Sequence, residues 1–186
     1  MKEKAKLTKE DWIKAGFRAL SKGGEQAIRI EAIAREIKVS KGSFYWHFKD
    51  LAALKKTMLE HWAKLATFDV IANISDIKAT PKEKLLLIIE MSSGEKNVEY
   101  GGLRTEEAIR NWARHDKKAA RVFAVVEKAR LTFVRELFLQ IGFDKNDSAM
   151  KARLLYAGLI GVEHLSIQNL SDMKADLVDL LEILCV

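Results

Sequence analysis

The fold of this chain is decided by one stretch of sequence, Ile33-Ala34-Arg35-Glu36-Ile37-Lys38-Val39-Ser40-Lys41-Gly42-Ser43-Phe44-Tyr45-Trp46-His47-Phe48. It predicts two short helices joined by a tight turn, with Val39 as the apolar plug of the turn and Ser40 as the N-cap of the second helix. On a helix that advances about 100° per residue, Phe44 and Phe48 share one stripe, and Trp46 lies on the roughly opposite side.

The aromatic run therefore divides into rings that face inward and rings that face outward. A small domain has little reason to expose Trp46 and Tyr45 unless a flat, polar partner meets them. Lys41 and Lys49 flank these rings, and the combination predicts a recognition helix in a DNA groove. Two other placements stay open: Trp46 could pack against the first helix, and His47 could pack beneath its own helix.

The positive charge of the chain is concentrated in the same region. Residues 1–60 hold 14 lysines and arginines against 8 acidic residues, whereas residues 61–186 hold 18 of each, so all of the net charge of +6 lies in the first third. A local positive field is what phosphate binding requires. The lysines at positions 2, 4, 6 and 9 could form an arm in the minor groove or simply a disordered tail.

Composition restricts the remaining possibilities. With one proline and ten glycines in 186 residues, the sequence favours long regular elements. Cys185 is the only cysteine, which excludes a disulfide framework and a cysteine-built zinc site. No apolar h-region follows the first lysines, and no apolar run reaches the roughly 20 residues that a membrane span needs. We therefore expect a cytoplasmic protein without a membrane partner.

The pattern along the chain predicts an all-α fold of about nine helices. Thr8 followed by Asp11 resembles a capping box, and Thr80 followed by Pro81 is a typical helix start. The only extended loop signal is the stretch 92–102. Helices are expected at about 8–20, 30–37, 41–50, 51–75, 82–91, 103–115, 117–141, 148–170 and 173–184, the last capped by Ser171.

The helices at 117–141 and 148–170 carry wide apolar bands, and Ala157, Gly158 and Gly161 leave a smooth patch on the second. Such a pair lies either in the middle of its own domain or against its copy across a two-fold axis. We expect a homodimer in which these helices form a four-helix bundle.

Residues 8–60 resemble the DNA-binding domain of the tetracycline-repressor (TetR) family of bacterial transcription regulators. The resemblance rests on the apolar first helix, on Ile33-Ala34 followed by Val39-Ser40, and above all on the tract from Ser43 to Lys49. It implies a three-helix helix-turn-helix domain at 1–50, a connecting helix at 51–75, and an effector-binding and dimerisation domain at 76–186. It also implies a dimeric repressor that binds palindromic DNA and is released by a small molecule.

Three positions depart from the family pattern. Lys38 stands where the turn usually has glycine, so a left-handed backbone there would cost of order 1 kcal/mol. Arg29 stands near the usual serine or threonine cap of the second helix, which it replaces poorly as a cap. Leu51 replaces a lysine that often contacts phosphate, and Lys49 or Lys55 could substitute for it.

The predicted DNA-binding residues fall into two groups. Lys41, Gly42 and Ser43 would face base edges, with lysine able to donate to guanine and glycine allowing close backbone approach. The others would contact phosphates or flank the interface: Arg29, Ser40, Tyr45, Trp46, His47, Lys49 and Lys55. Lys41, Gly42 and Ser43 could equally be ordinary solvated residues at the start of a helix.

The sequence gives only weak candidates for an effector pocket, namely the large residues Phe68, Ile71, Met91, Tyr100, Trp112, Phe123 and Tyr156, most of which could equally be core. No nucleophile elbow, phosphate loop, metal-ligand spacing or cofactor motif is present, so we expect no enzyme, no cofactor and no metal. Two other functions stay open: a DNA-binding protein of this fold without an effector (architectural or division-linked), and a helical protein–protein adaptor.

Overall fold

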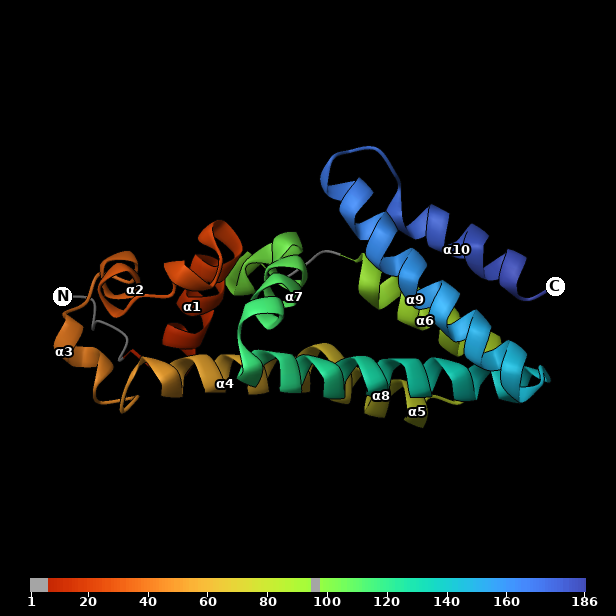
Figure 1. The fold of residues 1–186 in the computed structure, drawn as a ribbon, viewed down its shortest axis with the longest axis horizontal. Helices are drawn as coiled ribbons and strands as arrows, with labels where there is room; N and C mark the ends of the chain where they lie inside the picture. The colour runs from red at the N-terminus through yellow and green to blue at the C-terminus, as the bar shows by residue number, and fades with distance from the viewer. Residues whose placement is uncertain (1–6, 95–97) are drawn as a thin grey trace. The chain divides into compact units, whose positions relative to one another are not determined.

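The computed structural model describes residues 7–94 and 98–186, and within these ranges every regular element is helical, which confirms the predicted all-α class. Figure 1 shows the order of the helices. Lys2, Lys4 and Lys6 of the expected arm lie outside the described residues. The elements are α1 (Lys9–Gly23), η1 (Glu25–Ala27), α2 (Ile30–Glu36), α3 (Lys41–Phe44), α4 (Leu51–Ala63), η2 (Lys64–Phe68), α5 (Asp69–Asp76), α6 (Pro81–Ser93), η3 (Val98–Tyr100), η4 (Gly102–Arg104), α7 (Thr105–His115), α8 (Lys117–Ile141), α9 (Lys145–Ile167) and α10 (Met173–Leu184).

Two predicted helix starts are confirmed by their hydrogen bonds. The Thr8 side chain accepts from the Asp11 backbone N–H at 3.3 Å, and the Thr8 N–H donates to the Asp11 carboxylate at 2.8 Å. Thr80 and Glu83 make the same reciprocal pair at the start of α6, with Pro81 in the first turn. Each box satisfies two backbone donors that the first helical turn leaves free.

Other boundaries differ from the prediction. The recognition helix was expected to run to about residue 50, but α3 ends at Phe44. Beyond it the N–H groups of Tyr45 and His47 donate three residues back, to the carbonyls of Gly42 and Phe44. The last helix is capped by Asp172 rather than Ser171, since its carboxylate accepts from the N–H groups of the first turn at 3.1 Å.

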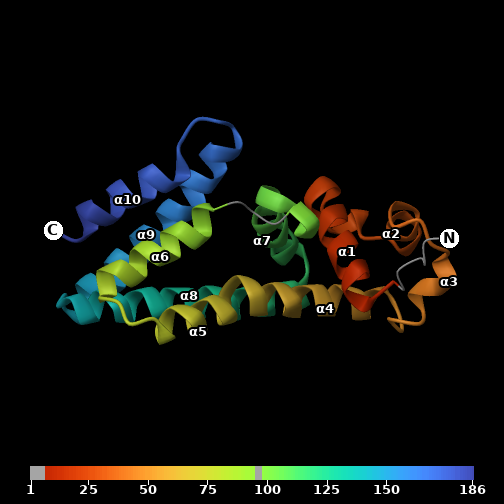
Figure 2. The ribbon, with the colours of Figure 1, turned by 180° about the vertical axis from the view of Figure 1, so that it is seen from behind.

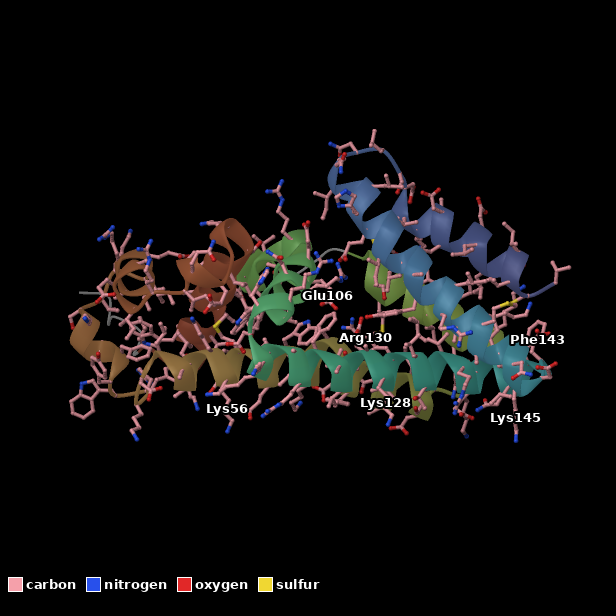
Figure 3. All side chains as sticks on the ribbon, in the orientation of Figure 1. Lys56, Glu106, Lys128, Arg130, Phe143 and Lys145 are labelled. Carbon is pink, nitrogen blue, oxygen red and sulfur yellow. The ribbon has the colours of Figure 1, made fainter. Side chains whose placement is uncertain are left out.

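The predicted connecting helix is interrupted by a π-helical segment. α4, η2 and α5 follow one another without a break over 51–76, and η2 carries one extra residue in its turn. Arg130 of α8, labelled in Figure 3, donates to the Thr67 hydroxyl at 2.9 Å and to the Ala66 carbonyl at 3.1 Å. Thr67 is buried. The wider turn is thus held by a side chain from another helix.

The turn between α2 and α3 is a Schellman motif. The Val39 N–H donates to the Ala34 carbonyl at 2.9 Å and the Lys38 N–H donates to the Arg35 carbonyl at 3.2 Å. This pattern needs a left-handed residue after the C-cap, and Lys38 has φ 58°. The strained lysine that the sequence predicted is therefore present.

The chain divides into two compact units that do not follow chain order. The first comprises residues 1–62 and 96–123, and the second comprises 63–95 and 124–186. The first unit thus contains α1 to α3 together with α7, which packs against α1 (Figure 2). The predicted boundary after residue 50 describes a division of function and stays a prediction.

The core of the first unit joins α1 to α2, α3 and α4. Its largest fully buried side chains include Trp12, Leu20, Ile28, Ile33, Phe44, Leu54, Met58 and Ile109. Gly16 permits the close approach of α4, because a Cβ at that position would lie 2.6 Å from the Met58 sulfur. Trp62 donates from Nε1 to the Glu106 carboxylate at 2.6 Å (Glu106 is labelled in Figure 3), which ties α4 to α7.

The second unit is built around α6, α9 and α10, with the carboxyl-terminal part of α8. α9 and α10 run antiparallel and lie side by side, as both views show (Figures 1 and 2). A Cβ at Gly158 would lie 2.3 Å from Leu180 Cδ2, so this glycine gives α10 its place on α9. The core consists of Leu85, Ile89, Val134, Leu137, Phe138, Ala152, Leu155, Met173, Leu177, Leu181 and Leu184.

Replacing Lys38 with glycine should stabilise the protein. Glycine removes the Cβ clash of the left-handed backbone, so Lys38→Gly is expected to raise the free energy of unfolding by about 1 kcal/mol, measured by urea denaturation at unchanged m. Lys38→Ala removes the same charge but keeps the Cβ and should give no gain. Equal stability of the two variants would show that strain at residue 38 is not the cause.

Candidate nucleic-acid interface

Phe44 anchors the reading helix from below. Its side chain is fully buried and meets the Trp12 ring edge-on at a centroid distance of 5.2 Å. Phe48 also stacks on Phe44, at 5.5 Å, and the Lys9 ammonium lies 5.2 Å from the Phe48 ring. These contacts fix the end of α3 on α1.

The two rings that follow Phe44 face solvent. Trp46 is 89% exposed and Tyr45 is 55% exposed, whereas His47 is half-buried. The Tyr45 ring rests edge-on against Phe44 at 5.3 Å, which limits its freedom. The predicted division of the aromatic run is therefore confirmed, although α3 itself ends at Phe44. Burial of Trp46 against α1, the alternative interpretation, is wrong.

The start of α3 presents small and charged groups. Ser40 occupies the N-cap position in extended backbone, but its hydroxyl makes no capping bond. Gly42 is exposed, and a Cβ there would meet only the Ser40 hydroxyl at 3.8 Å. Folding therefore does not require glycine at 42, and the bare backbone leaves room for a partner. Ser43 is half-buried beside it.

Lys41 is ion-paired with Glu31 of α2, and both side chains are more than half exposed. Hydrogen bonding from Lys41 lowers the pKa of Glu31, and the same contact raises the pKa of Lys41. Because solvent screens an exposed pair of this kind, it contributes little to stability, and Lys41 can exchange the carboxylate for another acceptor.

The other predicted phosphate contacts have different surroundings. Arg29 is exposed at the N-cap of α2 and, as expected, makes no side-chain cap. Lys49 is exposed and has no ion pair within the described part of the chain. Lys55 is instead ion-paired with Glu25 of η1. The carboxylate of Asp50 accepts from the Ala53 N–H at 2.8 Å, so it caps α4 beside Leu51.

The predicted effector residues fall into both units. Tyr100, Trp112 and Phe123 belong to the first unit, and Phe123 stacks on Trp62 at 5.9 Å. The other four candidates, in the second unit, are Phe68, Ile71, Met91 and Tyr156. Trp112 and Phe123 are buried, whereas Phe68 and Met91 are exposed. Their roles stay predictions.

Other kinds of site find no support in the described residues. They contain no cluster of three or more histidine, cysteine or acidic side chains able to hold a metal ion. Among the helices of these same residues, none has the length and apolarity for a bilayer crossing.

Comparison with known proteins identifies the helix-turn-helix. Residues 13–56 match the family model of bacterial regulatory proteins of the tetR family. This part of the chain is a TetR-type helix-turn-helix. The match supports the helix-turn-helix that the sequence predicted, and the family it names is one of bacterial regulatory proteins.

A curated relative carries the same module. The HTH-type transcriptional regulator YerO of Bacillus subtilis (strain 168), itself uncharacterized, is 35% identical over 79 residues, or 42% of this chain. That match spans 27% of the relative's own length, about a quarter.

Solved structures share the fold along nearly the whole chain. A TetR regulator from Legionella pneumophila has a TM-score of 0.79 at 14% identity and covers 97% of both chains. A regulator from Saccharomonospora viridis in complex with choline has 0.78 at 17%, covering 94% of this chain and 95% of that one. FadR from Bacillus subtilis in complex with stearoyl-CoA has 0.71 at 17%, covering 96% and 98%.

The sequence analysis did not predict two acidic residues that pair with lysines in this domain. Glu31 and Glu25 pair with lysines that the sequence assigned to DNA, at separations of 10 and 30 residues. Neither pair has the three- or four-residue spacing that a helical pattern reveals. Only the packing of α2 on α3, and of η1 beside α4, brings them together.

The divided aromatic run predicts that two substitutions differ strongly in their effect on stability. Phe44→Ala should lower the free energy of unfolding by about 3–5 kcal/mol, because it empties a fully buried site. Trp46→Ala should change it by less than about 0.5 kcal/mol, because the indole is exposed. Urea denaturation measures both. A large loss for Trp46→Ala would mean that the indole packs inside the protein.

Proposed function

We propose that this chain is a dimeric transcriptional repressor that binds palindromic operator DNA and is released by a small-molecule effector. One observation carries the proposal: Phe44 is buried while Tyr45 and Trp46, next in the chain, are exposed beside Lys41 and Lys49. An exposed aromatic and basic surface at the end of a TetR helix-turn-helix suits a DNA duplex. It acts on chromosomal DNA, and so in the cytoplasm.

On DNA, the residues are proposed to act in two ways. Lys41, Gly42 and Ser43 meet base edges, with Lys41 leaving Glu31 to donate to guanine O6 or N7. Phosphates are contacted by Arg29, Ser40, Tyr45, His47 and Lys49, with Trp46 against the backbone of the groove. We assign Lys55 a smaller share than the sequence suggested, because Glu25 already holds its ammonium.

The dimer is proposed to form through one stripe of α9. Met150, Leu154 and Leu165 are between 42% and 48% exposed, and the exposed Ala157 and Gly161 lie between them at helical spacing. A Cβ at Gly161 would meet nothing within 4 Å, so a second helix can approach closely here.

The burial pattern moves the proposed interface relative to the sequence expectation. The carboxyl-terminal apolar band of α8 (Val134, Leu137 and Phe138) is buried in the core of the second unit. α10 packs along α9 and leaves Ile183 70% exposed. We therefore propose that α9 and α10, rather than α8 and α9, form the four-helix bundle with their copies. On a palindromic operator, the two copies of α3 are proposed to enter successive major grooves, which lie about 34 Å apart.

Release by an effector is supported by the fold neighbours. Two of them were solved as complexes, one with choline and the other with stearoyl-CoA. These two ligands differ so widely in chemistry that they do not indicate the effector of this chain. A thermal-shift screen separates an effector-responsive repressor from a protein of the same fold without one, because a ligand raises Tm by mass action.

Variants of the reading helix should separate phosphate contacts from base contacts. The double variant Tyr45→Ala/Lys49→Ala is expected to weaken binding to all DNA sequences and to reduce the salt slope of log K by about 1 for the lost lysine. Ser43→Ala should instead alter preference among sequences selected from a random pool. Fluorescence anisotropy with labelled duplexes over a salt series measures both.

The matched control is Lys145→Ala, which removes one lysine from the exposed start of α9 (labelled in Figure 3). It should leave affinity and salt slope unchanged. Unaltered DNA binding in the double variant and in Ser43→Ala would show that α3 and the turn after it are not the reading element. Absence of DNA binding by the wild-type chain would favour the adaptor function.

The dimer proposal predicts which helix tolerates charge. Leu154→Glu/Leu165→Glu should convert the protein to a monomer near its chain mass of 21.1 kDa in sedimentation analysis, with unchanged helicity. The reason is that the added carboxylates of both chains would be buried in the interface without positive partners. The control Val125→Glu lies on α8 at a site that is 57% exposed and should stay dimeric. Dissociation by Val125→Glu alone would return the interface to α8.

A further inference from the structure

One side of α1 carries a row of polar side chains. Glu10, Lys14, Arg18 and Ser21 follow one another at intervals of four, four and three residues, which places them on a single helical face. Trp12 and Leu20, elsewhere on the same helix, are fully buried in the core. α1 therefore has an apolar face in the core and a second, polar face, and the sequence analysis predicted only the apolar one.

Residues 98–105, which we call the strap, pack against this polar row. The Tyr100 hydroxyl donates to the Glu10 carboxylate at 2.8 Å, and the Ser21 hydroxyl donates to the Gly101 carbonyl at 2.6 Å. The Lys14 ammonium lies 2.8 Å from the Glu99 carboxylate. The strap is thus bonded along three turns of α1, within the first compact unit.

Apolar contacts seat the same segment. The Tyr100 ring stacks on His61 of α4 at 5.1 Å and meets Phe17 at 5.8 Å. Burial, followed by the hydrogen bond to Glu10, raises the pKa of Tyr100 to about 12. Gly101 has φ 91°, and a Cβ there would lie 2.8 Å from the Phe17 carbonyl and 2.5 Å from the Thr105 hydroxyl. Backbone and α1 are therefore in direct contact, with no room for a side chain.

Arg18 connects this strap to the helix-turn-helix. Its Nη1 donates to the Glu99 carbonyl at 3.0 Å, and its Nε donates to the Glu36 carboxylate at 2.6 Å. Glu36 is the last residue of α2 and precedes the Schellman turn that sets the direction of α3. The planar guanidinium of Arg18 thus joins the strap to the end of α2. Lysine cannot replace such a two-directional fork.

We infer that Arg18 is a positioning residue for DNA recognition, through which the strap fixes the angle between α2 and α3. The inference rests on the proposed function, since it concerns how that same site reads an operator. Arg18 needs no contact with DNA for this role. Both partners of its ion pair are about one-third exposed or less (27% for Arg18 and 32% for Glu36), so the pair is more sheltered than Lys41–Glu31.

The first test removes the fork. Arg18→Met is expected to weaken binding to a selected operator about fivefold, the equivalent of a pair near 1 kcal/mol, with non-specific binding and its salt slope unchanged. Arg18→Lys keeps the charge but not the geometry and should behave like the methionine variant. The matched control Lys22→Met removes one charge from the exposed last turn of α1 and should bind the operator as the wild type does.

The second test displaces the strap without altering any charge. Gly101→Ala meets the α1 backbone, whereas Gly102→Ala pays the same type of left-handed cost (φ 69°) but would meet nothing within 4 Å. Gly101→Ala should lower operator affinity like Arg18→Met, and Gly102→Ala should not. In hydrogen exchange, the N–H groups of Ile37, Lys38 and Val39, which are bonded within the turn, should exchange faster in Gly101→Ala and Arg18→Met only.

The outcomes are distinct. Wild-type operator affinity and exchange in Arg18→Met would overturn the inference, as would full affinity in Arg18→Lys, which would reduce the role of Arg18 to its charge. A parallel fall in non-specific binding would make Arg18 a phosphate contact instead. Failure of the wild-type chain to bind any DNA would overturn the proposed function, while faster exchange in the two variants would still establish the coupling of strap and turn.

Discussion

The packing of Phe44 against Trp12 and Phe48 is the constraint on which the reading surface depends. A fully buried ring immediately before two exposed rings forces the chain to turn outward at that point. The burial of Phe44 therefore exposes Tyr45 and Trp46 to solvent. Their own affinity for water does not, since both side chains have large apolar surfaces. Without the anchor, nothing local would keep them out of the core.

The turn before α3 shows a compromise between local strain and tertiary demand. The Schellman bonds of Lys38 and Val39 satisfy carbonyls that α2 would otherwise leave free, and they require a left-handed residue where this chain has lysine. The backbone cost is tolerated because Ile33 and Ala34 are buried against α1. Arg18 adds support from the side, through Glu36 at the end of α2.

Each compact unit uses a glycine for close packing. Gly101 lets the strap meet the backbone of α1, and Gly158 lets α10 lie close to α9. At Gly161, one helical turn beyond Gly158, an added Cβ would have no neighbour within 4 Å among the described residues. Residues that look equivalent in the sequence thus serve packing within the chain in one case and remain available in the other.

Local sequence patterns predicted the all-α class, the capping box at Thr8, the cap at Thr80 and the division of the aromatic run, while the resemblance to the TetR family drew attention to Lys38 in the turn. Each follows from spacing, caps and backbone preference, which act over a few residues. The sequence also predicted the reading residues themselves, whose contacts with DNA remain proposals.

Packing between distant elements sets which charges are paired and which compact units form. Lys41 and Lys55 each meet a glutamate from another element, and Arg18 links Glu36 to a strap some 80 residues away. The first unit likewise takes residues 96–123 from beyond α6. Helical periodicity shows which face of a helix is apolar, but it carries no information about which distant segment covers that face or which partner its charges meet, because those depend on packing between elements.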